Sequence, residues 1–184
     1  MTTLFAPPSV VTGLDDVSPA DLDPRWWVVH TRPRCEKKLD DWFAQQGWEH
    51  YLPLRRKVHV YASKRVEFRH PLFPGYSFGR FALMERRAVF GSDFAARVIA
   101  VEDQEALLSQ LAPIRLALEN EATLSLCPYL DHGTRVRVTA GKMRGLEGIV
   151  QRRSGRARVV LSVDLLQQAV SLEVDEGLLT IIPG

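Results

Sequence analysis

The sequence has only two cysteines, no long apolar run and no recognisable signal peptide, and each of these shortages excludes a class of protein. Cys35 and Cys127 lie in different halves of the chain, which favours free thiols in a reducing compartment over a disulfide framework. The apolar runs are a few residues long, too short to cross a membrane. The first residues, MTTLFAPPSV, lack the charged and apolar regions of a secretory signal. We therefore expect a cytoplasmic protein.

Catalytic and metal-binding patterns are also missing. No histidine stands at a metal-ligand spacing from a cysteine, a glutamate or another histidine. The five histidines are His30, His50, His59, His70 and His132. No serine or cysteine stands in a nucleophile motif. We expect a protein that acts by binding and has no catalytic residues, cofactor or metal.

Composition changes along the chain predict how it divides. Residues 1–24 contain four prolines and four aspartates with few periodic apolar positions, as in a flexible leader. Residues 25–118 alternate between strand-like and helix-like patterns, which predicts an α+β sandwich with a mainly antiparallel sheet. Residues 119–128 read as a linker, and residues 129–184 as a second unit.

The expected first unit opens with a strand and a helix. The run RWWVVH is apolar and β-prone. In the segment that follows, Thr31 is expected to cap a helix, with Leu39, Trp42 and Phe43 on one face and Gly47 at its end. A hairpin turning at residues 62–64, a strand at about 76–81 and a helix kinked or split at Pro113 are expected further on.

The second unit reads as all-β. In GTRVRVTAG, Val136 and Val138 alternate with charged or polar residues. Four more short strand-like runs, GLEGIVQRR, RARVVLSV, QAVSLEV and LLTII, are separated by turn residues. Five short strands in about 55 residues predict a small closed barrel, and this glycine-rich, alternating pattern argues against a switch to helix.

Large apolar groups crowd beside a turn in the stretch RHPLFPGYSFGRF, residues 69–81. On a strand, Tyr76 and Phe78 point to one face and Phe81 to the other. These aromatic side chains can fill a core, or they can anchor a partner, because they bury much area with few rotatable bonds. The residues alone favour the core.

Basic residues cluster in two places, although the formal net charge is only +2. The first cluster falls in the expected first turns of the helix, where cations oppose the helix dipole but exposed amides suit a phosphate. It comprises Arg32, Arg34, Lys37 and Lys38. A phosphate site and a solvated face are equally favoured there. The second cluster lies on the hairpin, where a plain exposed face is favoured. It comprises Arg55, Arg56, Lys57, Lys64 and Arg65.

Taken together, these motifs resemble the NusG family of transcription elongation factors, which includes RfaH-type specialised paralogues. Four segments carry the resemblance: WWVVHTRPRCEKKL, YLP, PLFPGYSF and, some 55 residues later, GTRVRVTAGKMRGLEGIV, which is similar to a KOW motif. The resemblance covers about residues 25–182. It implies an N-terminal domain that binds the clamp helices of RNA polymerase and a C-terminal SH3-like KOW barrel that recruits a second partner.

The resemblance also assigns roles to residues. Polymerase contacts are implied for His30, Phe73, Tyr76, Phe78, Arg86 and Arg87. Contacts to displaced non-template DNA are implied for Arg32, Arg34, Lys37 and Lys38. Contacts of the KOW loop with Rho or a small-subunit ribosomal protein are implied for Lys142, Met143 and Arg144. We expect a monomer, and the leader and the PLFPGY context favour a specialised paralogue over the general factor.

Two other readings of the chain stay open. A KOW-containing RNA-binding or ribosome-associated protein would place the basic groups of the barrel on RNA. These are Arg135, Arg137, Arg152, Arg153, Arg156 and Arg158. A nucleic-acid-modifying enzyme is the weaker alternative, because no catalytic motif supports it.

Overall fold

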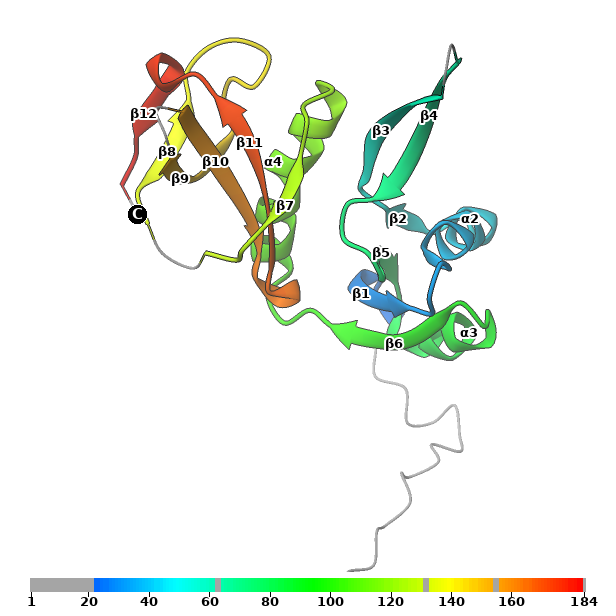
Figure 1. Cartoon of the computed structure of the whole chain (residues 1–184). Coiled ribbons are helices and arrows are strands. Elements are labelled where there is room, and N and C mark those ends of the chain that lie inside the picture. The colour runs from blue at the N-terminus through cyan, green and yellow to red at the C-terminus, as the bar shows by residue number, and fades with distance from the viewer. Residues whose placement is uncertain (1–21, 62–63, 131–132, 154–155, 184) are drawn as a thin grey trace, which may run out of the picture.

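A four-stranded sheet, a separate two-stranded hairpin and a six-stranded sheet form the strand framework, with one long helix beside the six-stranded sheet (Figure 1). The computed structural model describes residues 22–61, 64–130, 133–153 and 156–183. The predicted leader therefore lies almost wholly outside the described residues. Every pairing in these sheets is antiparallel, which confirms the expected mixed α/β class with mainly antiparallel sheets.

The N-terminal sheet has the order β2-β5-β1-β6. Its strands are β1 (Arg25–Thr31), β2 (Glu49–Tyr51), β5 (Tyr76–Phe81) and β6 (Ala95–Ala100). In the central strand β1, Trp27 and Val29 point to one face and Val28 to the other, and all three are buried. Both faces of this sheet are therefore covered.

Two helices cover the first face of the N-terminal sheet. They are α2 (Glu36–Gln46) and α3 (Arg86–Gly91), which is preceded by a 3₁₀ turn (Leu83–Glu85). Leu39 and Phe43 of α2 and Val89 of α3 pack on Trp27, Val29 and Phe81. The ring centroids of Phe43 and Phe81 lie 6.0 Å apart, in a stacked arrangement. This face thus holds an aromatic core.

The long helix α4 (Gln104–Glu119) packs on the second face. Leu107, Leu111 and Ile114 of α4 belong to one apolar cluster with Val28 and Phe78 of the sheet. The sequence predicts a kink or a break at Pro113, but α4 continues through this proline as one helix. Proline removes one backbone hydrogen bond, and the burial of the apolar face on both sides of it keeps the helix continuous.

The start of α2 differs from the sequence prediction. Thr31 does not cap the helix, because it belongs to β1, where its N–H donates to the carbonyl of Gly75 at 2.8 Å. The helix begins at Glu36, and Cys35 is its N-cap residue without a side-chain cap bond. Gly47 ends the helix in the left-handed conformation, as predicted.

A hairpin projects from the N-terminal sheet (Figure 1). It consists of β3 (Leu54–Tyr61) and β4 (Lys64–Pro71). The turn was predicted at residues 62–64, and two of these, 62 and 63, lie outside the described part of the chain. Val58 lies opposite Glu67, and Lys57 opposite Phe68. Because these neighbouring pairs point to opposite faces, Val58 and Phe68 do not form one apolar face.

The C-terminal sheet has six strands in the order β12-β8-β9-β10-β11-β7. Five were predicted: β8 (Arg135–Val138), β9 (Glu147–Arg153), β10 (Arg156–Val163), β11 (Gln168–Val174) and β12 (Leu179–Ile181). The sixth, β7 (Ser125–Cys127), comes from the predicted linker and pairs with β11. Hydrogen bonds do not join β12 to β7 among the described strands, so the closed barrel stays a prediction.

The C-terminal sheet contacts α4 directly. The side chain of Gln110 donates to a carboxylate oxygen of Asp164 at 2.7 Å and accepts from the Asp164 backbone N–H at 2.9 Å. The hydroxyl of Tyr129 donates to the other carboxylate oxygen at 2.9 Å. The apolar cluster around α4 continues into this sheet through Val136 and Leu161. One helix therefore belongs to a core shared by both sheets.

Gly79 in β5 offers a direct test of the aromatic core. A Cβ atom at this position would lie 2.8 Å from Cζ of Phe43, which is fully buried. We expect Gly79→Ala to lower the free energy of unfolding by about 1–3 kcal/mol, the usual cost of overpacking. Gly91→Ala is the control, because a Cβ there meets nothing within 4 Å, and we expect it to stabilise by about 0.5 kcal/mol. Equal midpoints of the two variants in urea unfolding would contradict this packing.

Candidate functional site

The aromatic stretch begins with a tight turn at residues 73–76. The N–H of Tyr76 donates to the carbonyl of Phe73 at 3.2 Å, and Gly75 has a φ of 83°. Proline followed by a residue of positive φ is typical of a type II turn, and only glycine adopts this φ without strain. The N–H of Gly75 also donates to Oε1 of Glu36 at 2.8 Å. The turn is thus fastened to the start of α2 and, through Thr31, to the end of β1.

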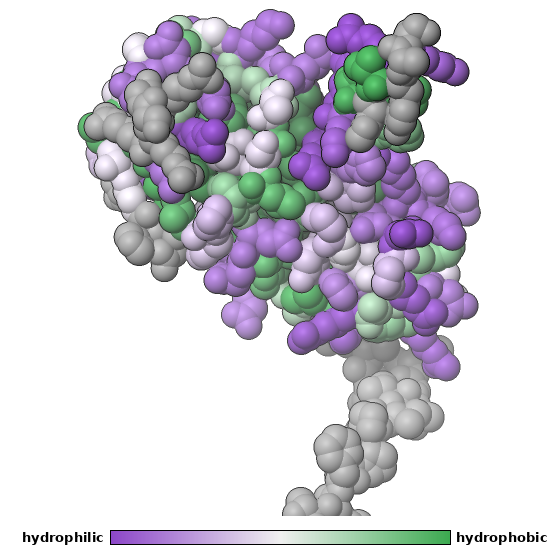
Figure 2. Space-filling view, in the orientation of Figure 1, coloured by the Kyte–Doolittle hydropathy of each residue, from purple (hydrophilic) through white to green (hydrophobic). Residues whose placement is uncertain are grey.

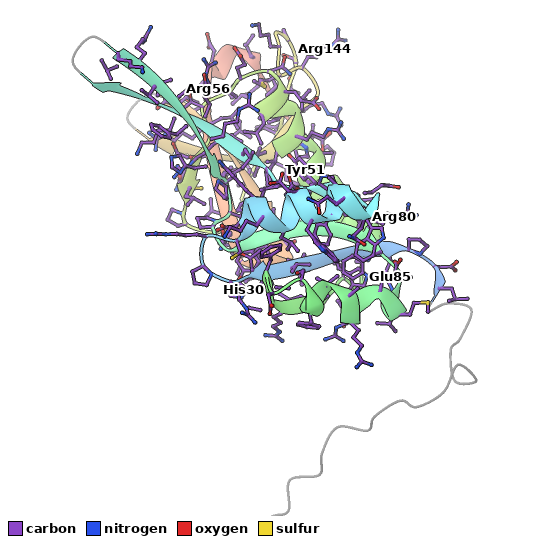
Figure 3. The ribbon with its side chains drawn as sticks, turned by 90° about the vertical axis from the view of Figure 1, so that its right-hand side faces the viewer. His30, Tyr51, Arg56, Arg80, Glu85 and Arg144 are labelled. Carbon is purple, nitrogen blue, oxygen red and sulfur yellow. The ribbon has the colours of Figure 1, made fainter. Side chains whose placement is uncertain are left out.

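His30 and Tyr76 form an aromatic pair beside this turn. They lie opposite each other on β1 and β5, and their ring centroids are 5.1 Å apart. His30 is exposed and Tyr76 is half-buried. His30 lies at one end of the N-terminal sheet (Figure 3). This pair is the accessible part of the predicted aromatic surface.

Phe73 and Phe78 do not lie on that surface, which corrects the sequence prediction. Both side chains have no exposed area and belong to the apolar cluster shared with α4. Phe78 points to the sheet face that α4 covers, and Phe73 is turned inward by the tight turn. These residues support Tyr76 from beneath, and in this structure they contact no solvent.

Variants that remove the Phe73 or the Phe78 ring test whether these residues stabilise the fold or only contact a partner. We expect Phe78→Ala and Phe73→Ala to lower the free energy of unfolding by about 3–5 kcal/mol, as for other phenylalanines removed from cores. His30→Ala is the control and should change it by less than about 1 kcal/mol, because His30 is exposed. Thermal unfolding of the three variants checks this. A Phe78→Ala variant that melts like the parent chain would show that the ring is not part of the core.

A basic groove lies next to the turn. It is lined by Arg34 and Lys37 from the start of α2 and by Arg55, Arg69 and His70 from the hairpin. Glu36 and Glu67 also line it, but Glu36 accepts the Gly75 N–H, and Glu67 lies 2.8 Å from Arg56. The arginine and lysine side chains that line the groove therefore outnumber its two carboxylates, which already have partners within the chain. Hydrophilic residues dominate the surface over α2 in Figure 2.

The groove is lined by some residues of each predicted basic cluster, namely Arg34 and Lys37 of the first and Arg55 of the second. The other members of the two clusters do not line it. Arg32 precedes the helix, is not in its first turn, and lies 3.5 Å from exposed Asp93, outside the groove lining. Lys38 is exposed on α2 but does not line the groove. Arg34 also precedes the helix and has a φ of 62°, a strained conformation for a residue with a side chain.

Sequence reasoning missed three residues of this region. Glu36 holds the turn, and an acidic residue in the first turn of a helix was the available signal. Arg69 and His70 begin the quoted aromatic stretch, yet no role was assigned to them. Their contribution depends on the hairpin folding beside α2, which no local pattern reports.

The other predicted contacts lie apart from the groove. Arg86 and Arg87 are exposed at the start of α3, at the end of the N-terminal unit distant from the hairpin (Figure 1), and the Arg86 guanidinium lies 5.7 Å from the centre of the Phe90 ring. In the loop between β8 and β9, Lys142 and Arg144 are exposed. Met143 is half-buried against the core, so less of its side chain is accessible to a partner than predicted.

The arginines of the C-terminal sheet whose side chains the structure describes are paired with carboxylates. Arg137 lies 2.6 Å and Arg135 3.5 Å from Glu147, and Arg158 lies 3.2 Å from Glu173. The side chains of Arg152, Arg153 and Arg156 lie outside the described part of the structure. These pairs reduce the positive potential that an RNA-binding face would need.

The described residues contain no group of three or more histidine, cysteine or acidic residues placed to hold a metal ion. Within the same residues, no helix is both long enough and apolar enough to cross a membrane.

Comparison with known proteins identifies the N-terminal unit. Residues 24–106 match the family model described as transcription termination factor NusG. This unit belongs to the NusG family. No curated protein matches the chain. The match spans β1 to the first turn of α4, and so includes the turn, the aromatic pair and the basic groove. NusG-family proteins are transcription factors of elongation and termination that act with RNA polymerase, and they form no enzyme family.

Proposed function

We propose that this chain is a transcription elongation or antitermination factor that binds the clamp helices of RNA polymerase through its N-terminal unit. The observation that carries the proposal is the fastened turn at residues 73–76, which presents Tyr76 beside His30 within a NusG-family domain. Half-buried aromatic side chains on a rigid support make strong interface anchors, because little conformational entropy is lost when they bind.

A second polymerase contact, on α3, would explain how the factor suppresses pausing. Arg86 and Arg87 on α3 would meet the opposite side of the polymerase cleft. Two contacts on one rigid unit raise the effective concentration of each for its own site. A factor that bridges the cleft in this way holds the clamp closed and suppresses pausing. The distance between α3 and the turn is set by the N-terminal sheet, because α3 packs on one face of it and the turn runs directly into β5.

The basic groove supplies a site for non-template DNA in the elongation complex. Arg34 and Lys37 provide the charges that the sequence assigned to this role, and Arg55 and Arg69 add two more. Phosphate contacts of this kind bind without reading sequence directly and weaken as salt rises. The strained φ of Arg34 supports a functional reading, because such strain is retained where it serves a site.

The proposal extends to the C-terminal sheet as a KOW unit that recruits a second partner, either Rho or a small-subunit ribosomal protein. The exposed ends of the β8–β9 loop, Lys142 and Arg144, are the contacts it would offer. Because β7 pairs with β11, we place the start of this unit at Ser125, earlier than the sequence suggested. The N-terminal unit then comprises residues 25–119.

Tyr76 can be tested against core RNA polymerase. We expect Tyr76→Ala to weaken binding by about 30-fold, which corresponds to the ~2 kcal/mol typical of an aromatic anchor. Tyr76→Phe keeps the ring and should bind within a few-fold of the parent chain. A pull-down or fluorescence titration measures the affinity, with thermal melting in parallel. Unchanged affinity of Tyr76→Ala, with an intact fold, would remove this residue from the interface.

Two neighbouring lysines provide a matched test of the groove. Lys37→Glu changes a residue that lines the groove, whereas Lys38→Glu makes the same charge change one residue outside it. We expect Lys37→Glu to weaken binding to an elongation complex with exposed non-template DNA and to reduce the slope of log K against log salt by about 1.

Polymerase without nucleic acid is the control for that test. Both variants should bind it as the parent chain does. If Lys38→Glu weakens binding to the elongation complex as much as Lys37→Glu, then net charge and not the groove is responsible.

A further inference from the structure

A second site lies between the sheet edge and α4, at a distance from the turn and the basic groove. This aromatic cleft has a volume of about 580 Å³. Trp26, Trp48 and Tyr51 line it from the sheet side, and Leu108, Leu111 and Ala112 from α4. Figure 3 shows Tyr51 well separated from His30. The family comparison assigns no role to these residues.

The walls of the cleft are held in place before anything binds. The backbone N–H of Trp26 donates to the side chain of Gln104 at 2.7 Å, and the Gln104 amide donates back to the Trp26 carbonyl at 3.0 Å. Trp48 meets Trp42 edge to face, and Tyr51 stacks on Phe78. A fixed aromatic surface loses little conformational entropy when it binds a ligand.

Two features show that the cleft is unfilled by the described residues. Leu108 keeps 44% of its surface exposed and lines the cleft opposite the two tryptophans. The hydroxyl of Tyr51 is buried and has no hydrogen-bond partner among the described residues. Burial raises the pKa of Tyr51 to about 12, so the hydroxyl keeps its proton at neutral pH. It is a donor that needs an acceptor.

These features suit a proline-containing peptide. Proline has no N–H, so its segments adopt an extended helix with all carbonyl groups free to accept hydrogen bonds. Such segments bind grooves lined by aromatic side chains, where tryptophan and tyrosine contact the proline rings and donate to the carbonyls. A cleft lined by two tryptophans, the ring of a tyrosine and an exposed leucine has the apolar part of such a groove. The Tyr51 hydroxyl itself is closed off from the cleft.

The chain itself carries such a segment close to the cleft. Residues 4–8 read Leu-Phe-Ala-Pro-Pro. The described structure begins at Leu22, four residues before Trp26, which is at most about 14 Å of chain. Thirteen residues lie between Pro8 and Leu22, and a random coil of that length spans roughly 20 Å. A tether that matches the distance to its site gives effective concentrations in the millimolar range.

We propose that the aromatic cleft binds the chain's own N-terminal segment, with Phe5, Pro7 and Pro8 against Trp26, Trp48 and Tyr51. The proposal gives a specific role to the segment that the sequence analysis describes as a flexible leader. It stands apart from the proposed function, because neither polymerase nor nucleic acid takes part.

The tryptophan indole N–H signals in two-dimensional NMR of the full chain provide the test. Deletion of residues 2–18 should shift the signals of Trp26 and Trp48. The signal of Trp27 should stay in place, because its buried indole donates to the carbonyl of Phe81 at 2.9 Å. A synthetic peptide of residues 1–18, added to the shortened chain, should restore the original positions, and a peptide with Pro7→Ala and Pro8→Ala should not.

A matched pair of surface variants completes the test. Leu108→Glu places a charge in the cleft and should reproduce the spectrum of the deletion. Leu126→Glu changes a leucine of equal exposure, 44%, on β7 and should not. The unchanged Trp27 signal confirms that each variant is folded. If Trp26 and Trp48 do not respond to the deletion, the segment is not the occupant. Binding of an unrelated proline-rich peptide to the shortened chain alone would then assign the cleft to another protein.

Discussion

Side chains of β1 and β5 alternate between two apolar cores, and this alternation decides which aromatic residues can reach a partner. Trp27 and Phe81 enter the core beneath α2 and α3, whereas Val28 and Phe78 enter the core beneath α4. A sheet covered on both faces buries the side chains in the middle of its strands, whichever way they point. Exposure returns only toward the strand ends, where His30 and Tyr76 lie.

The same constraint explains why the candidate polymerase and DNA contacts are neighbours. The chain leaves β1 after Thr31 and enters α2 at Glu36, and the carboxylate of Glu36 returns to hold the turn before β5. One short loop therefore positions Arg34 and Lys37 beside the turn that presents Tyr76. A factor that binds polymerase with this turn would bring its basic groove to the nucleic acid in one orientation, because the two surfaces share a rigid support.

Helix α4 has a wider role than that of a cover for one sheet. Its apolar residues belong to a cluster that includes both sheets, and Gln110 fixes it to Asp164 at the edge of the second sheet. The middle of the same helix lines the aromatic cleft. Anything that moves α4 would therefore affect the aromatic cleft and the packing of the two sheets together. This coupling follows from a shared core, since packed interiors transmit displacements.

Local patterns of the sequence determined the elements of this protein. A β-prone apolar run located β1, short strand-like runs located β5 and the five strands from β8 to β12, and a glycine marked the end of α2. These signals depend on residues close together in the chain. The order of strand-like and helix-like segments also predicted the mainly antiparallel class. The glycine and proline of residues 73–76 predicted a turn, which is a local property of their backbones.

Tertiary structure alone decided which of the predicted site residues are accessible. Phe73 and Phe78 carry the same signal as Tyr76 in the sequence, but α4, some 30 residues later, buries them. Pro113 marks a break by local rules, yet packing on both sides keeps the helix whole. Arg69 joins Arg34 only because a hairpin folds beside a helix start. Burial and charge clustering depend on which distant segments meet, and a one-dimensional pattern does not contain that information.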